Sequence, residues 1–154
     1  MTIHEFKLFA DYHQFYVKDD FADGDLSDSW SEESIQQALG VAPGIIGIGT
    51  IRAMTVPVTI EVRTGPPAFD DFGEWDRINE CSISIPSGRL VVAGCSDYLP
   101  DAPRILLIPG IYRARIYYGG YATIHADGLE GDDRYRVVLW TEPYSNTCTL
   151  KEPK

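Results

Sequence analysis

The sequence predicts a mainly β fold, in which two antiparallel sheets pack as a β-sandwich with one short helix. Apolar and polar residues alternate along most of the chain, as in strands with one buried face. Clusters of Gly, Pro and Asp separate these runs at intervals typical of a sandwich. The chain has 154 residues, the length of one domain. We predict a sandwich domain over residues 1–145 and a polar C-terminal tail over residues 146–154.

Each strand is predicted from its alternation. In the run at 56–62, Val56, Val58 and Ile60 point to one side, and Pro57, which has no backbone N–H to donate, suggests a sheet edge. Similar runs predict strands at residues 4–9, 12–17, 45–53, 104–108, 111–118 and 134–141. Together with a hairpin at 80–95, these runs supply enough strands for two sheets.

The segment ECSISIPSGRLVVAGC, residues 80–95, predicts that hairpin, with Ser87 and Gly88 in a two-residue turn. The resulting register puts the apolar residues of both strands on one buried face. These residues are Cys81, Ile83, Ile85, Leu90 and Val92. Cys95 falls on the other face, which disfavours a disulfide between Cys81 and Cys95.

One helix is predicted after the acidic stretch of the N-terminal quarter. Ser29 can cap its N-terminus, and Glu32 three residues later completes a capping box. Gly40 supplies a left-handed end to the helix. The predicted buried stripe comprises Ile35, Ala38 and Leu39.

The net charge of −10 limits the classes of partner. A chain this acidic lacks the basic surface that nucleic-acid phosphates require, whereas a cationic partner suits it. Acidity is also an ordinary means of keeping a protein soluble, and both explanations stay open. No segment resembles a signal peptide or a membrane span. Three scattered cysteines suit a reducing compartment, and we predict a cytoplasmic protein.

Motifs for metal and nucleotide binding are incomplete. A calcium loop with Gly24 at its sixth position has Phe21 third and Trp30 twelfth, where oxygen ligands are needed; other calcium geometries stay open. In GIIGIG, residues 44–49, the third glycine of a dinucleotide motif is replaced by Arg52, and no helix pattern follows. These glycines therefore relieve crowding or form a bulge.

The chain also lacks a recognisable catalytic motif. The nucleophile elbow is absent, His13 lies in an aromatic strand and His125 lies in a polar turn. We predict no enzyme activity, no cofactor and no metal. A hydrolase remains a third hypothesis, which needs His13 or His125 within reach of a carboxylate or hydroxyl in a cleft.

Alternation in IYRARIYY and RYRVVLW predicts a basic stripe if these two strands are neighbours. Its members are Arg113, Arg115, Arg134 and Arg136. One interpretation is that they form salt bridges with Glu61 and nearby loop carboxylates. The other is a site for a small anionic or sugar-like ligand, held by forked guanidinium groups. The aromatic residues of that site would be Tyr98, Tyr117 and Tyr118.

The most specific stretch is YHQFYVKDDFADGDLSDSWSEE, residues 12–33, which holds seven carboxylates and no basic residue after Lys18. YHQFYV at 12–17, followed by WSEESI at 30–35, resembles the start of the competence protein J family, whose known member inhibits a nuclease. A Pro-Gly-x-Tyr turn at 109–112 is similar in pattern, whereas residues 64–103 and the loop DGLEGDD depart from the family. The resemblance implies a protein that binds another protein, such as a nuclease or toxin with a basic cleft.

Closely spaced carboxylates would compete with phosphates for such a cleft, and electrostatic steering would raise the association rate. The leading hypothesis is therefore an acidic inhibitor or immunity-type partner of a basic nuclease or toxin. Its predicted partner-binding residues are Asp19, Asp20, Asp23, Asp25 and Asp28 in the first loop, with Asp127, Glu130, Asp132 and Asp133 in DGLEGDD extending the surface. The alternative is the anion-binding module with the arginine stripe.

Overall fold

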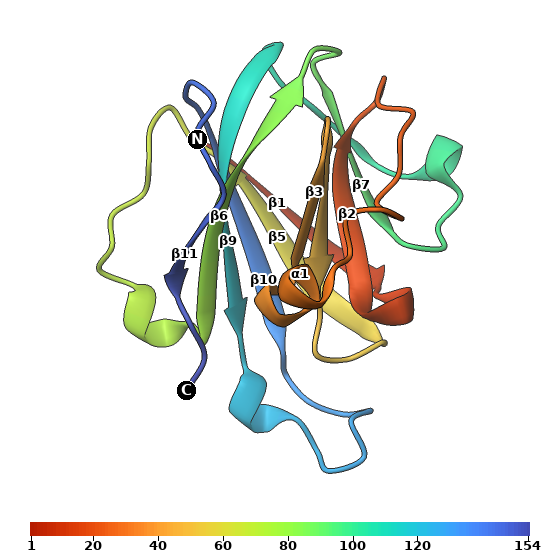
Figure 1. Ribbon diagram of the computed structural model, residues 1–154, viewed down its shortest axis with the longest axis vertical. Coiled ribbons are helices and arrows are strands. Elements are labelled where there is room, and N and C mark those ends of the chain that lie inside the picture. The colour runs from red at the N-terminus through yellow and green to blue at the C-terminus, as the bar shows by residue number, and fades with distance from the viewer.

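The computed structural model describes residues 1–154 and contains two β-sheets packed face to face (Figure 1). In spatial order, the six-stranded sheet comprises β1 (Thr2–Phe9), β5 (Thr55–Val62), β10 (Arg134–Thr141), β9 (Gly110–Gly119), β6 (Arg77–Ile85) and β11 (Cys148–Lys151). The five-stranded sheet comprises β3 (Leu39–Ala42), β4 (Ile45–Gly49), β2 (Gln14–Asp19), β7 (Arg89–Gly94) and β8 (Arg104–Leu106). The prediction of a mainly β, two-sheet fold is confirmed.

Helical structure is limited to short segments. The α-helix is α1 (Glu32–Gln37), and the 3-10 turns are η1 (Asp11–His13), η2 (Phe72–Glu74), η3 (Leu99–Asp101) and η4 (Tyr121–Thr123). No helix is long and apolar enough to cross a bilayer.

The strand pairing is not wholly antiparallel. All pairs in the five-stranded sheet are antiparallel, but β10 runs parallel to β5 in the six-stranded sheet. A parallel pair needs a long connection, and here the chain between them forms β6 to β9. Pro57 was expected at a sheet edge, yet β5 lies between β1 and β10. The proline is tolerated there because β10 pairs only with residues 58–62 of β5.

The predicted pairing of the two strands in the hairpin at 80–95 is wrong, but the residues predicted to be buried are buried. β6 pairs with β9 and β11, whereas β7 pairs with β2 and β8 in the other sheet. Ser87 and Gly88 therefore connect the two sheets, and Gly88 has the positive φ of 70° that such a turn requires. The five apolar residues assigned to one buried face all lie in the central core. Two strands that face one core from opposite sheets have the same alternation as a hairpin.

The predicted helix is shorter than expected and begins later. Its N-cap is Ser31, with Ser34 completing the capping box, and Ala38 ends it in a left-handed conformation. Side chains from the six-stranded sheet hold this end, because Asn79 donates to the carbonyl of Gln37 and the Tyr118 hydroxyl donates to that of Ala38. Leu39 is buried but belongs to β3, as does Gly40, and Ile35 is 63% exposed. The tail expected at 146–154 contains the edge strand β11.

The core lies between the sheets and comprises mostly aliphatic side chains with a few aromatic rings. Phe15 and Tyr118 both pack edge-on against Tyr135, with ring centroids 5.9 and 6.0 Å away. The Tyr135 hydroxyl accepts from the backbone N–H of Ile51 and donates to Asp133. A buried tyrosine needs such partners for its hydroxyl group.

Candidate protein-binding site

The acidic loop between β2 and α1 lies across the outer face of the five-stranded sheet, where glycines make room for it. A Cβ at Gly47 would lie 2.5 Å from the Leu26 side chain and 2.8 Å from the Trp30 ring. A Cβ at Gly40 would lie 3.2 Å from the same ring. Gly47 of GIIGIG therefore relieves crowding, as expected. Its missing side chain leaves room for Leu26 of the loop to be buried against the sheet.

The first two carboxylates of this loop hold it in place. Asp19 is buried and accepts hydrogen bonds from the backbone N–H and hydroxyl of Ser87, at 3.0 and 2.6 Å. Asp20 forms salt bridges with Arg89 at 2.8 Å and Arg104 at 3.1 Å. Hydrogen bonds from Arg89 and then Arg104 lower the pKa of Asp20 below its ordinary value. Both residues were predicted to bind a partner, and in the structure both contact other residues of this chain.

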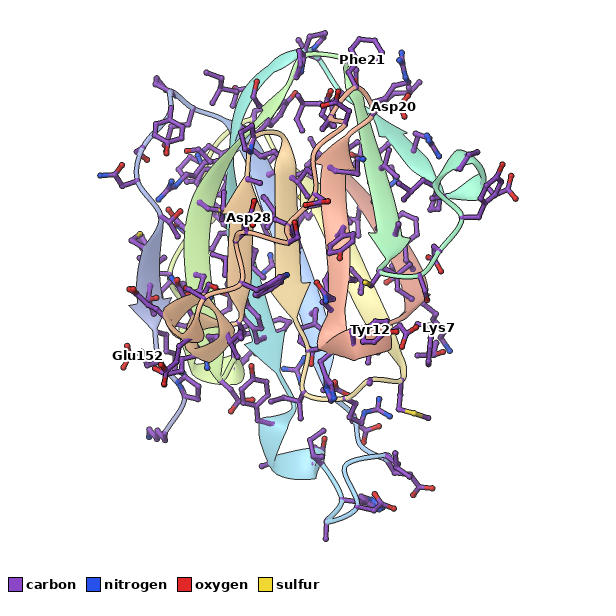
Figure 2. All side chains as sticks on the ribbon, turned by 45° about the vertical axis from the view of Figure 1, so that its right-hand side comes forward. Lys7, Tyr12, Asp20, Phe21, Asp28 and Glu152 are labelled. Atoms are coloured by element: carbon purple, nitrogen blue, oxygen red, sulfur yellow. The ribbon has the colours of Figure 1, made fainter.

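The remaining carboxylates of the segment are exposed. They form what we term the acidic ridge, comprising Asp23, Asp25, Asp28, Glu32 and Glu33. None of the five takes part in a salt bridge. Asp25 accepts from the backbone N–H and hydroxyl of Ser27, which lowers its pKa. Figure 2 shows the loop descending from Asp20 and Phe21 at one end of the sandwich to Asp28 over the sheet.

The second predicted acidic loop lies elsewhere. Arg52, just beyond the Gln14 end of β2, donates to the Leu129 carbonyl, whereas the first loop leaves β2 at Asp19. The first loop therefore leaves β2 at the end of the sandwich opposite to the second loop (Figure 1). Asp127, Glu130 and Asp132 are exposed, but Asp133 is fully buried in a salt bridge with Arg52 at 2.5 Å.

The arginine stripe forms, because β9 and β10 are neighbours, but its charges are already paired. Glu80 accepts from both Arg113, at 3.0 Å, and Arg115, at 2.6 Å. Arg136 forms salt bridges with Glu61 and Asp71, both at 2.8 Å. Arg134 has no carboxylate partner and its guanidinium lies 4.6 Å from the centre of the Trp75 ring. The salt-bridge interpretation thus accounts for three of the four arginines.

The aromatic residues proposed to complete an anion site are not brought together with the stripe. Tyr117 and Tyr118 are fully buried, on opposite faces of β9, and Tyr98 is exposed on the segment before η3. The predicted small-ligand site at the stripe therefore has one guanidinium group without a carboxylate partner, that of Arg134, and no lining of accessible tyrosines.

The histidines and possible metal ligands show no catalytic arrangement. The His125 ring lies 3.3 Å from Glu130, but both side chains are exposed on the loop before β10. His13 Nδ1 lies 3.1 Å from the carbonyl oxygen of Ile51. No group of three or more His, Cys, Asp or Glu side chains is arranged to hold a metal ion, and the three cysteines are free thiols.

Sequence reasoning missed a cavity at the Gln14 end of the sandwich. Its walls include Tyr12, His13, Trp30, Arg77 and Tyr121. The first three belong to the YHQFYV and WSEESI segments, which carry the resemblance to the competence protein J family. Arg77 and Tyr121 come from distant parts of the chain, and no local pattern links them.

Comparison with solved structures identifies two proteins of similar fold. One is ComJ from Bacillus subtilis, inhibitor of the DNA-degrading activity of NucA, with a TM-score of 0.68, 14% identity and coverage of 92% of this chain and 96% of that one. The other is the product of crocagin biosynthetic gene J, with a TM-score of 0.64, 21% identity and coverage of 92% and 97%. No protein-family model and no curated sequence matches the chain. The resemblance to the competence protein J family is confirmed, as a remote likeness in fold.

Proposed function

We propose that this protein binds a basic protein partner through the acidic ridge and inhibits it, with a nuclease or a toxin as the partner class. The observation that carries the proposal is the ridge itself, which has five exposed carboxylates without a salt bridge, three on the loop and two on α1. The loop is anchored through Asp19 at its start and through Leu26 and Trp30 against Gly47. A cationic cleft that holds phosphates presents the complementary field, so the ridge would steer the two proteins together.

The fold supports the partner class. ComJ, a protein of similar fold, inhibits a DNA-degrading nuclease, although fold alone does not determine function. The proposal assigns no catalytic activity to this chain, and the cytoplasmic location stays a prediction that cell fractionation would test.

The test compares two variants that change the net charge equally. The ridge variant carries Asp23→Asn, Asp25→Asn and Asp28→Asn. The control carries Asp127→Asn, Glu130→Gln and Asp132→Asn, three exposed positions at the other end of the sandwich. Exposed substitutions of this kind change stability by about 0.5 kcal/mol or less, so both variants should fold.

The partner is first captured from a native lysate with wild-type protein, and association rates are then measured over a salt series. We expect the ridge variant to associate about tenfold more slowly at low salt and to lose most of its salt dependence, because steering depends on charges close to the interface. The control should retain most of the wild-type rate. For a nuclease partner, DNA degradation should be inhibited by wild type and less by the ridge variant.

Two results would overturn the proposal. One is capture of proteins no more basic than those bound by an unrelated acidic protein. The other is equal slowing in both variants, which would mean that net charge alone, and not the ridge, acts on the partner.

A further inference from the structure

The cavity at the Gln14 end of the sandwich has a volume of about 580 Å³, within the range of small-molecule sites. It lies between the 3-10 turn η1, the helix α1 and the adjoining ends of β4, β6 and η4. The acidic ridge contributes no residue to it. The helix α1 nevertheless carries both Glu32 and Glu33 of the ridge and Ile35 of the cavity wall.

The residues that line the cavity include three buried polar atoms without a hydrogen-bond partner. They are Gln14 Oε1, Trp30 Nε1 and Arg77 Nε, and the whole protein has five such side-chain atoms. A buried polar atom without a partner is costly, and three of the five belong to residues of this cavity wall. The set offers two N–H donors and one acceptor.

Arg77 supplies a positive charge that the protein does not neutralise. Unlike seven of the other eight arginines, it forms no salt bridge. Glu33 and Glu152 line a neighbouring hollow that Arg77 also borders, but neither pairs with it. Burial raises the pKa of the Tyr121 hydroxyl, whereas a hydrogen bond with Arg77 and the charge of Arg77 lower it. The guanidinium thus lies near a phenol and remains without a counterion.

Much of the remaining lining is apolar, and two of its residues have a strained backbone. Ile35 and Ile51 are partly exposed side chains of the wall, and Ala38 completes it. Tyr12 and His13 both have positive φ, 55° and 60°, although neither is glycine. Consecutive residues in this conformation are unfavourable and occur preferentially at binding sites. The surrounding structure therefore holds these strained residues at the cavity wall.

We propose that this cavity binds a small ligand with one carboxylate and an aromatic or apolar body. The carboxylate pairs with Arg77, a residue of the cavity wall. The apolar body contacts the isoleucine walls. One cation in a chain of net charge −10 matches a single negative charge and disfavours polyanions. The carboxylate belongs to a free aromatic acid or to the C-terminal residue of a peptide.

The experiment compares acids with their neutral amides. The probes are phenylacetate against phenylacetamide, for a free acid, and acetyl-Gly-Phe against its C-terminal amide, for a peptide end. Binding is measured by titration followed by two-dimensional NMR, which locates the affected residues. We expect saturable shifts at the cavity, with one acid bound about tenfold more tightly than its amide, because the charged hydrogen bonds are lost in the amide. The tighter of the two acids identifies the source of the carboxylate.

Matched variants assign the charge. Arg77→Gln should remove the preference for acid over amide, whereas Arg134→Gln, at the other arginine without a carboxylate partner, should retain it. If Arg77→Gln does not fold, Ile35→Glu places a repelling charge at the exposed cavity rim, with Leu106→Glu as a control at a residue that is 79% exposed elsewhere. Absence of saturable shifts at the cavity with both acids, or equal binding of acid and amide, would overturn the proposal. Arg77→Gln should leave capture of a basic partner unchanged.

Discussion

The charged side chains over the outer faces of the two sheets differ in how they are paired. On the six-stranded sheet, Arg113, Arg115 and Arg136 are paired with carboxylates. Residues 67–72 cover part of this face, with the Pro67 carbonyl accepting from Arg115 and the Phe69 ring 4.7 Å from its guanidinium. On the five-stranded sheet, the acidic ridge has no counterions within the chain and lies in solvent.

This contrast shows that a run of like charges is not by itself a binding surface. The arginines hold a loop onto a sheet, because burying a guanidinium group requires carboxylate and carbonyl partners. Their charge is neutralised by carboxylates of the same chain. The ridge carboxylates have no such role, and their field reaches solvent, where a partner can respond to it.

The largest effect is expected on the arginine face. Glu80→Gln removes the carboxylate that Arg113 and Arg115 share, and it leaves two almost fully buried guanidinium groups underpaired. We expect the free energy of unfolding to fall by about 3–5 kcal/mol, as when one partner of a buried pair is removed. Urea denaturation measures this loss.

Asp28→Asn on the ridge is the matched control. It removes one charge from an exposed side chain, and its unfolding free energy should stay within about 0.5 kcal/mol of wild type. Similar losses in the two variants would contradict the division into a structural face and a free one.

Much of the fold was predictable because alternation reports which side chains are buried. Val56, Val58 and Ile60 lie in the core as expected. Strand pairing was harder to predict. Ile85 and Leu90 face one core from two different sheets, and their strands therefore show the same alternation as a hairpin. The strand β11 escaped prediction because the residues of CTLK are largely exposed and polar, and it pairs along one edge only.

The site was predictable in composition but not in detail. The sequence identifies the acidic loop, but nothing local separates Asp19, which bonds to Ser87 across 68 positions, from the exposed Asp23. Asp132 and Asp133 are likewise neighbours, and only the second meets Arg52. Such differences depend on contacts between residues far apart in the chain, which the local sequence does not predict.

An intermediate effect is expected from the glycine under the ridge. In Gly47→Ala the new methyl group would overlap Leu26 and Trp30, and overpacking of this kind costs about 1–3 kcal/mol. We expect lower stability, altered tryptophan fluorescence and slower association with a captured partner, because Leu26 and Trp30 can no longer pack closely against the sheet.

Gly24→Ala is the control for this change. A Cβ at Gly24 meets no atom within 4 Å, so its stability and association rate should match those of wild type. If Gly47→Ala unfolds more readily yet associates at the wild-type rate, then the anchored position of the ridge is not what a partner recognises.

The smallest effect is expected at Asp20, the one carboxylate of the acidic stretch that forms salt bridges with arginines. The salt bridges with Arg89 and Arg104 lower its pKa in the folded state relative to the unfolded chain. The stabilisation is therefore fully present above the unfolded pKa of about 3.9 and is lost as the pH falls through the folded value. Asp20→Asn should be slightly less stable than wild type near neutral pH, and the difference should vanish in acid. Thermal unfolding of both proteins between about pH 7 and pH 2 measures this. A difference that persists at the acid limit would mean that Asp20 acts by shape and not by charge, and the pairing would then differ in kind from that on the arginine face.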